Sequence, residues 1–380
     1  MMKFLHLSDL HLGKRVNEFS MIEDQEYILT KILHIVDEEK PDGIFLAGDI
    51  YDKSVPSEDA IKLLNHSLLR LAKRKVETFL ISGNHDSAVK RSFASDLIDL
   101  SGIHISPVYC GEIHPFHMEK GKDKVNIFML PFIKPSIVKA VFPDEAEAIH
   151  DYTDACRVAI SHIPTKEAET NILIAHQFVT GATRSESEEI SVGGLDNVDA
   201  DVFDSFQYVA LGHIHGPQKI GRETIRYSGT PLKYSFSEVN HKKSVSVIEI
   251  EKKEINVRTI DLIPLRDMRE ITGTFDEIVS KDFYQDTPTD DYLHVILKDE
   301  DDIPDAMGKL RVIYPNIMKV TYDNKRTREN RELSEVVDVE TKSPFTLFSE
   351  FYEAQNNQPM NHEQKEFLIS LMDTIWKESK

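Results

Sequence analysis

Five short apolar runs in this chain each end at residues of a type that binds divalent metal ions. In an α/β protein the reactive groups gather where strands end and loops begin, so five strands can direct five short motifs to one point. The pattern therefore predicts an α/β fold with a single site assembled from distant segments. The runs span residues 3–7, 44–47, 78–81, 172–175 and 208–211, and the residues that follow them are Asp9 and His11, Asp49, Asn84 and His85, His176, and His213 and His215.

Each of these motifs is a weak signal when it is considered by itself. Asn84-His85-Asp86 could equally be a capped turn. A single histidine is also often a hydrogen-bonded interior residue, the role that we predict for His6, His34, His66, His104, His114, His117 and His162. That explanation fails jointly for the site histidines, because each follows an apolar run directly or has a second ligand-type residue beside it.

The combined set of side chains predicts a particular chemistry. Two Asp, one Asn and several His, without Cys, suit Mn²⁺, Fe²⁺ or Zn²⁺ better than Ca²⁺ or a thiolate-bound zinc. Asp49 stands between two groups of candidate ligands and could bridge two ions roughly 3.5–4 Å apart, which is the spacing of two-metal hydrolytic sites. Hydrolysis of a phosphoester is therefore the reaction that the residues themselves favour.

The order of the expected elements divides the chain into four parts. Helical periodicity predicts helices at about 21–40, 57–75 and 92–100, and strands separated by turns at 203–261 predict a mixed sheet closed by an antiparallel meander. Residues 265–323 follow as a small βαβαβ domain. Residues 324–343 are charged and form either a linker or a phosphate-facing edge. Residues 344–380 contain two apolar-faced helical patterns that form a helical hairpin, which docks on its own body or on a partner.

Composition narrows the class of protein. The 380 residues carry a formal net charge of −20, which is unlike the basic surface that nucleic-acid binding normally uses. Two cysteines, Cys110 and Cys156, are too few for a disulfide framework, so we expect a reducing cytosol. Apolar stretches stay well below the roughly 20 residues of a membrane helix, so no membrane association is expected.

The five motifs together resemble the signature of the calcineurin-like metallophosphoesterase superfamily. Within it the chain is similar to the SbcD family of DNA double-strand-break repair nucleases. That similarity rests on the motifs at 8–13, 83–87 with 92–95, 192–196, and 210–215 with 227–232. The resemblance implies a four-layer αββα sandwich as a nuclease domain at 1–264, followed by a capping domain and a C-terminal helical hairpin that binds an SbcC-like ABC ATPase.

The resemblance also implies a role for each site residue. One metal would be held by Asp9, His11, Asp49 and His215, and the other by Asp49, Asn84, His176 and His213. His85 would position or protonate the scissile phosphate and leaving group, with Asp86 orienting it and Asp52 as a further supporting carboxylate. The family members are Mn²⁺-dependent, form a homodimer within a heterotetramer with the ATPase, and act on DNA in the cytoplasm, in association with the nucleoid. The implied activities are duplex-end exonuclease and single-strand or hairpin endonuclease, in double-strand break repair and recombination.

Two alternatives stay open at this point. The first is another phosphodiesterase or phosphatase of the same superfamily. Serine/threonine phosphatases of this fold carry Asp-Arg-Gly after the Gly-Asp motif, whereas this chain has Asp52-Lys53-Ser54. The second is a non-catalytic scaffold on the same fold, although every ligand-type position here is occupied.

Overall fold

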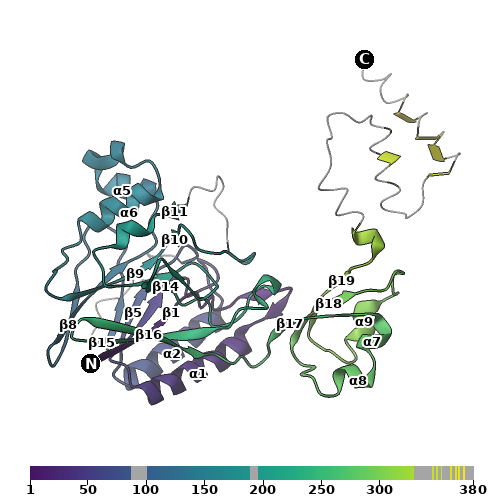
Figure 1. Cartoon of the computed structure of the whole chain (residues 1–380), viewed down its shortest axis with the longest axis horizontal. Coiled ribbons are helices and arrows are strands. Elements are labelled where there is room, and N and C mark those ends of the chain that lie inside the picture. The colour runs from purple at the N-terminus through teal and green to yellow at the C-terminus, as the bar shows by residue number, and fades with distance from the viewer. Residues whose placement is uncertain are drawn as a thin grey trace. The chain divides into compact units, whose positions relative to one another are not determined.

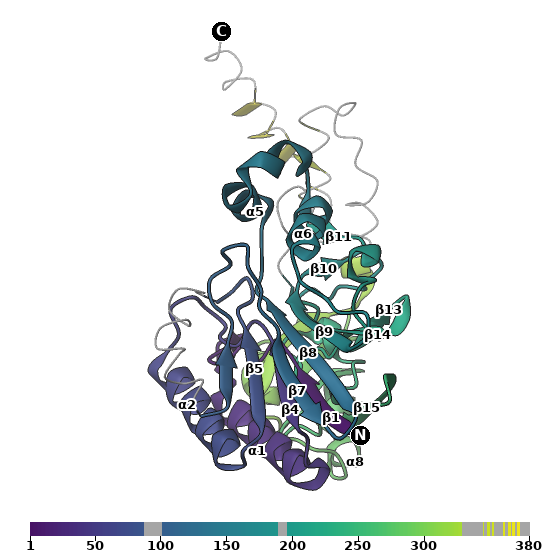
Figure 2. The same ribbon diagram turned by 90° about the vertical axis from the view of Figure 1, so that its left-hand side faces the viewer.

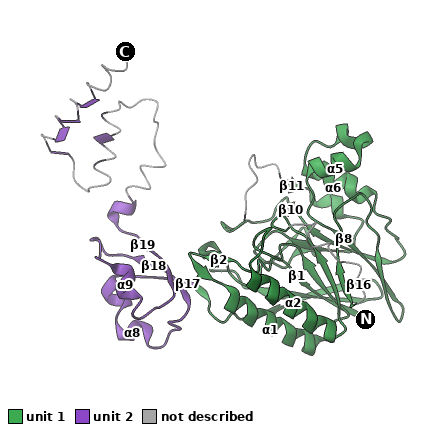
Figure 3. Cartoon of the chain, turned by 180° about the vertical axis from the view of Figure 1, so that it is seen from behind, with its two compact units in different colours: residues 1–268 green, residues 269–380 purple. Residues whose placement is uncertain are grey.

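A computed structural model of the chain describes residues 1–86, 101–188 and 196–328, together with scattered positions between 345 and 372. Residues 1–268 and 269–380 form two compact units (Figure 3). The helix predicted at 92–100 and the motif residues 87, 92–95 and 192–195 lie outside the described residues. Most of the predicted linker at 324–343 and of the hairpin at 344–380 also lies outside them.

The first sheet of the larger unit has six strands in the order β16 (Glu254–Asp261), β15 (Ser244–Glu251), β1 (Met2–Leu7), β4 (Gly43–Ala47), β5 (Glu77–Ile81) and β6 (Ile103–Ile105). Figure 1 labels β1, β5, β15 and β16 of this sheet. The four strands from β1 to β6 pair parallel, and β15 and β16 add antiparallel to the side of β1. Parallel pairing sets the carboxyl ends of β1, β4 and β5 along one edge of the sheet.

The second sheet has six strands in the order β13 (Gln218–Ile220), β14 (Arg222–Tyr227), β12 (Tyr208–Gly212), β9 (Thr170–His176), β8 (Asp123–Leu130) and β7 (Phe116–Lys120). Its central strands pair parallel, with antiparallel strands at both sides. The prediction of one antiparallel meander at 203–261 was wrong. The strands β12 and β14 pair parallel in the second sheet, and β15 and β16 belong to the first sheet. Turn spacing cannot distinguish the two outcomes, since both place short strands between turns.

The two sheets pack face to face around an apolar layer. Aromatic side chains Phe4, Phe45 and Phe79 of the first sheet meet Ile172 and Tyr208 of the second in one buried cluster. Residues on both faces of these strands are buried, which explains why β4, β9 and β12 are continuous apolar runs rather than alternating ones.

Helices cover the outer faces of both sheets. Figure 2 shows α1 (Ile22–Glu39) and α2 (Glu58–Lys73) side by side against the first sheet, in agreement with the helices predicted there. The helix α6 (Tyr152–Ser161) covers the second sheet with α5 (Pro135–Val141) beside it. Short elements complete this unit: β2 (Arg15–Val16), β3 (Phe19–Ser20), β10 (Phe178–Val179), β11 (Asn197–Val198), and the 3₁₀ turns η1 (Pro143–Ala148), η2 (Ala200–Phe203) and η3 (Phe236–Glu238).

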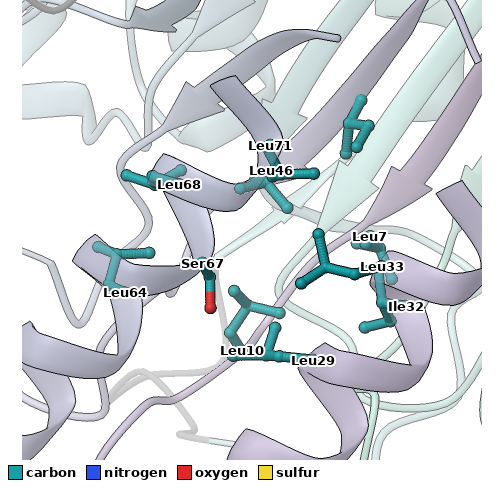
Figure 4. A pocket seen from close by; sticks show the side chains of 11 residues that line it. Leu7, Leu10, Leu29, Ile32, Leu33, Leu46, Leu64, Ser67, Leu68 and Leu71 are labelled. Carbon is teal, nitrogen blue, oxygen red and sulfur yellow. The ribbon is translucent and has the colours of Figure 1, made fainter. Parts of the chain in front are cut away.

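A cavity of about 30 Å³ lies between α1, α2 and the first sheet (Figure 4). Leucines such as Leu29, Leu46 and Leu64 line it, and Ser67 contributes the one hydroxyl, which donates to the carbonyl of Leu63. An apolar cavity of about 150 Å³ is needed to hold a benzene-sized molecule. This cavity is therefore a local gap in packing and not a ligand site.

The smaller unit follows the predicted order of strand, helix, strand, helix, strand. Its sheet runs β17 (Met268–Gly273), β18 (Tyr292–Leu297), β19 (Ile317–Tyr322), with β18 and β19 parallel. The helices α7 (Phe275–Ile278), α8 (Lys281–Tyr284) and α9 (Ala306–Leu310) are short, and Ile278, Leu293 and Leu310 contribute to a separate buried core. Among the described residues, no helix combines the length and apolar character needed to cross a membrane.

Candidate metal centre

The predicted site residues gather where the facing edges of the two sheets meet. They follow β1, β4 and β5 in the first sheet and end or follow β9 and β12 in the second. Three groups of acidic and histidine side chains place their ligand atoms within 4.8 Å of one another: Asp9, His11 and His215; Asp9, Asp49 and His176; and His11, Asp49 and His85. The sequence prediction that distant motifs form one cluster is thus confirmed in geometry.

Backbone conformation at the site is strained. The φ angles of Asp9, His11, Asp49 and His213 are 53°, 44°, 47° and 102°, values that side-chain-bearing residues rarely adopt. Hydrogen bonds compensate: the amide of Asp9 donates to the carbonyl of Gly48, and the amide of His11 donates to that of Asp49. Such strain persists only where surrounding contacts fix it, and it is concentrated at functional sites.

Two glycines let the loops approach each other. A Cβ at Gly83 would lie 2.1 Å from Asp49 Oδ1, and a Cβ at Gly212 would lie 1.8 Å from the carbonyl oxygen of Ala47. Because the second contact is with backbone, no side-chain movement can relieve it. The glycine before Asn84 and the glycine before His213 are therefore requirements of the close packing of the motifs.

One half of the cluster presents electron pairs to a common point. His176 Nδ1 donates to the carbonyl of Ala47 at 2.8 Å, which leaves Nε2 facing Asn84 Oδ1 at 3.0 Å and Asp49 Oδ2 at 3.3 Å. His213 Nδ1 also lies 3.0 Å from Asn84 Oδ1. Burial lowers the pKa of His176, but the charge and hydrogen bond of Asp49, together with the charge of Asp9, outweigh burial and raise that pKa to about 9. The surroundings of Nε2 therefore favour positive charge at this point.

The other half pairs two imidazoles. His11 Nε2 and His215 Nε2 lie 3.2 Å apart, and both rings are almost fully buried. Burial lowers the pKa of His11 well below its usual value, so the neutral ring, which can ligate a metal, is favoured. Burial raises the pKa of Asp9 to about 6, with the negative charge of Asp49 adding to the rise. Crowded carboxylates and facing ring nitrogens of this kind are stabilised by cations.

The donor set matches the chemistry of divalent transition metals. Buried carboxylate, amide oxygen and imidazole groups, without a thiolate, suit divalent ions such as Mn²⁺, Fe²⁺ or Zn²⁺. Two ring nitrogens, His213 Nε2 and His11 Nδ1, are buried and have no hydrogen-bond partner among the described residues. Buried polar atoms are normally hydrogen-bonded, so these two rings are not placed simply to fill the core.

His85 differs from the buried histidines, because its side chain is 18 % exposed. Its Nδ1 lies 3.0 Å from the carbonyl of Asp52 and its amide donates to Asp49 Oδ1. The Asp86 carboxylate accepts from the amides of Ile50, Tyr51 and Gly83 and so joins two motif loops. The ring of His85 is bonded through Nδ1 to the carbonyl of Asp52, and the expected role of Asp86 in orienting that ring stays a prediction. The Asp52 carboxylate itself accepts from Lys14 Nζ at 2.8 Å.

Sequence reasoning missed the residues that support the motif loops. On α1, the Gln25 amide donates to the carbonyl of His11 and to the hydroxyl of Tyr234, which in turn donates to the carbonyl of Leu10. Around His215 a further set of polar residues is mostly buried, namely Ser187, Glu188, Thr230, Glu238 and Lys243. No pattern in the sequence marks these residues, although a glutamine on the buried stripe of an amphipathic helix is a signal that could have identified Gln25.

Comparison with known proteins agrees with the geometry. The calcineurin-like phosphoesterase family model matches residues 2–217, and the type 5 capsule protein repressor C-terminal domain (SbcD_C) model matches residues 264–356. The SbcD subunit of the SbcCD nuclease from Staphylococcus saprophyticus is 31 % identical over 99 % of both chains, and that from Staphylococcus epidermidis is 32 % identical over 98 % of this chain and 99 % of its own.

Among solved structures, a dimetal phosphatase from Danio rerio covers 69 % of this chain and 96 % of its own, with a TM-score of 0.40 and 10 % identity. A likeness this low carries no argument about function. The full-length relatives and the two family models are decisive instead. The chain belongs to the SbcD family of nuclease subunits, within the calcineurin-like metallophosphoesterase superfamily.

Proposed function

We propose that this chain hydrolyses DNA phosphodiester bonds with two divalent ions, most readily Mn²⁺, as a duplex-end exonuclease and a single-strand or hairpin endonuclease in double-strand break repair. The observation that carries the proposal is the convergence of buried ring nitrogens and carboxylate oxygens within 4.8 Å at the facing sheet edges. Both relatives are named as nuclease subunits, and the chain matches each of them over 99 % of its length, which supports hydrolysis of a phosphodiester as the reaction class.

The proposed ligand set follows the two halves of the cluster. Asp9, His11 and His215, with Asp49, would hold one ion; Asn84, His176 and His213, again with Asp49, would hold the other. Asp49 is the shared residue because its Oδ2 lies 3.3 Å from His176 Nε2 and 3.9 Å from His11 Nε2. When bound, a pair of such ions supplies Lewis acidity and a water of lowered pKa.

His85 is the proposed proton donor. With Nδ1–H donating to the Asp52 carbonyl, the ring can present Nε2 to a group that enters the site, and the side chain is partly exposed. A histidine in this position can orient the scissile phosphate and donate a proton to the departing oxygen. In this proposal Asp86 and Asp52 act through the loops, since Asp86 ties three amides and Asp52 provides the carbonyl.

The remaining parts of the chain receive proposed roles from the family. Residues 1–264 would be the four-layer nuclease domain and residues 265–323 a capping domain, followed by a linker at 324–343. Residues 344–380 would be a helical hairpin that docks on an SbcC-like ABC ATPase, since the relatives are named as subunits of SbcCD. A homodimer within a heterotetramer, in the cytoplasm at the nucleoid, completes the proposal.

Substitution of Asp49 tests the two-metal assignment. Linear duplex DNA is incubated with Mn²⁺ and either the parent or Asp49→Ala, with and without the ATPase, and bound metal is measured by calorimetry. The variant should lose cleavage and stoichiometric binding of two ions together, because two cations would face each other without the anion between them. Retention of two ions by Asp49→Ala would contradict the shared-ligand role, and an inactive parent under all conditions would favour the scaffold alternative.

A further inference from the structure

The ring of His215 is held from behind by two polar side chains. Ser187 Oγ lies 2.8 Å from His215 Nδ1 and donates to Glu238 Oε1 at 2.6 Å, while Glu238 Oε1 itself is 3.4 Å from the same ring nitrogen. Glu238 is fully buried, and Ser187 is partly buried. Neither Ser187 nor Glu238 belongs to the motifs that predicted the ligands.

The charge state of Glu238 determines the direction of every proton in this chain of hydrogen bonds. Lys243 Nζ donates to Glu238 Oε2 at 2.5 Å, and the amide of Tyr234 donates to Glu238 Oε1. An ionised carboxylate accepts hydrogen bonds but cannot donate them. The Ser187 hydroxyl proton therefore points to Glu238, and its oxygen is left to accept from His215. Ser185 Oγ also lies 2.9 Å from Ser187 Oγ, and it donates its own proton to Glu188 Oε1.

His215 Nδ1 must therefore carry a proton. The Ser187 hydroxyl already donates its proton to Glu238, so its oxygen can only accept a hydrogen bond from His215 Nδ1–H. A neutral imidazole with Nδ1 protonated carries its lone pair on Nε2. That nitrogen faces His11 Nε2 at 3.2 Å, inside the cluster. The two polar side chains thus favour the tautomer in which Nε2, the nitrogen inside the cluster, can bind a metal ion.

The backbone of His215 is held separately from its ring. Its amide donates to Glu188 Oε1 at 2.6 Å, and its carbonyl accepts from Lys243 Nζ at 2.8 Å and from the Thr230 amide at 3.1 Å. Loss of the Ser187 hydroxyl would leave all three of these bonds in place. Ser187 is therefore suited to a test in which the ring of His215 changes and its loop does not.

We propose that Ser187 is a positioning residue for the metal centre, acting with Glu238 to fix the tautomer and orientation of His215. The proposal rests on the proposed ligand role of His215. Residues that orient a metal-binding histidine through its second nitrogen typically contribute about 10–100-fold in metal affinity. The segment that carries Ser187 would then belong functionally to the site, although it provides no ligand.

The test titrates metal-free full-length protein with Mn²⁺ by calorimetry. Ser187→Ala should weaken binding of one ion by about 10–100-fold, with an unchanged melting temperature of the metal-free protein, and Ser187→Thr, which keeps the hydroxyl, should restore most of the affinity. Ser237→Ala is the matched control, because Ser237 Oγ accepts from the amide of Glu186 and so holds the same segment without touching His215. Equal losses in Ser187→Ala and Ser237→Ala would overturn the proposal in favour of simple loosening of the segment.

A spectroscopic measurement separates tautomer from packing. In metal-free protein with ¹⁵N-labelled histidine, His215 should show a protonated Nδ1 and an unprotonated Nε2, and Ser187→Ala should shift this balance toward a mixture. An unchanged tautomer in Ser187→Ala would overturn the proposal. His215→Ala distinguishes failure of the ligand role of His215 from failure of the positioning role of Ser187. If His215→Ala leaves Mn²⁺ affinity intact, the ligand set is wrong. If it lowers Mn²⁺ affinity and Ser187→Ala does not, only the positioning role fails.

Discussion

The residues of this site meet two different requirements, and different residues meet each one. Asp49, His176 and His213 must present electron pairs in a buried place, and Gly83 and Gly212 must let the loops come close enough for them to do so. The first demand can be recognised from residue type at a strand end. The second depends on which loop lies opposite, and it becomes visible only with distances.

Substitution of His85 distinguishes a proton donor from a ligand. His85→Ala should keep two bound Mn²⁺ ions and the parent melting temperature, yet cleave DNA at least roughly a hundredfold more slowly, since general acid–base catalysis contributes about 10²–10⁴-fold. Metal analysis, thermal melting and single-turnover cleavage on one preparation decide the matter. A drop in metal occupancy before any loss of rate would instead make His85 a ligand, and an unchanged rate would refute both roles.

Substitution of Gly212 tests the close approach of the two sheets. Gly212→Ala would place a methyl group 1.8 Å from the Ala47 carbonyl, so the strands must separate, and we expect a loss of about 3 kcal/mol or more in the free energy of unfolding. Gly221→Ala is the control, because its Cβ would meet nothing within 4 Å although its φ of 64° still costs roughly 1–2 kcal/mol. Urea unfolding measures both. Gly212 does not share the positive φ of Gly221, so a loss at Gly212 no larger than that at Gly221 would mean that the strands separate at little cost.

At the scale of elements, the two sheets are joined by polar as well as apolar contacts. His6 on β1 places Nδ1 3.0 Å from the Tyr208 hydroxyl and Nε2 3.2 Å from the Leu211 carbonyl, both on β12. Sequence reasoning predicted His6 to be an interior histidine, and its complete burial agrees with that role. The same prediction holds for the buried His104 but was wrong for five histidines that are exposed: His34, His66, His114, His117 and His162. This bridge lies three residues before Asp9, so it ties together the two strands whose ends carry most of the site.

The His6 bridge makes folding sensitive to acid. Burial lowers the pKa of His6 from 6.5 to about 3, so between these values the unfolded chain binds a proton that the folded chain excludes. Stability from this group is complete above pH 6.5 and falls as the pH falls, by roughly 2 kcal/mol at pH 5. Unfolding free energies of the parent and of His6→Asn at pH 7 and 5, without metal, check this. In His6→Asn, unfolding between pH 7 and 5 should take up about one proton fewer than in the parent, so its unfolding free energy should depend less on pH. An equal dependence in both proteins would contradict the low pKa of His6.

The element scale also explains what could be read from the sequence. Strand ends and the α1 and α2 helices follow from local patterns, because apolar runs and helical periodicity are properties of short segments. The division of the 203–261 strands between two sheets is not local, since it depends on the parallel pairing of β12 with β9. Gln25 and Ser187 were missed for the same reason: their hydrogen bonds join segments that are far apart in the chain.

At the scale of the whole molecule, the negative net charge of the chain opposes binding of the proposed substrate, DNA. A net charge of −20 repels a polyanion, and the proposed ions neutralise only part of it. We therefore expect DNA cleavage by this chain to depend on a partner that supplies a basic surface. We expect the proposed ATPase to supply such a surface and to bind at the C-terminal segment.

Truncation of the C-terminal segment tests this division of labour. Residues 1–268 contain their own buried cores, and residues 269–322 contain another, so deletion of 344–380 should leave the melting temperature and Mn²⁺-dependent hydrolysis of a small phosphodiester unchanged. Phe367 and Leu371 are 70 % and 44 % exposed, and docking of this segment on a partner would cover them. Co-purification with the ATPase should therefore be lost. A truncated protein that unfolds would show that the segment packs on its own body, and one that still co-purifies would place the contact elsewhere on the chain.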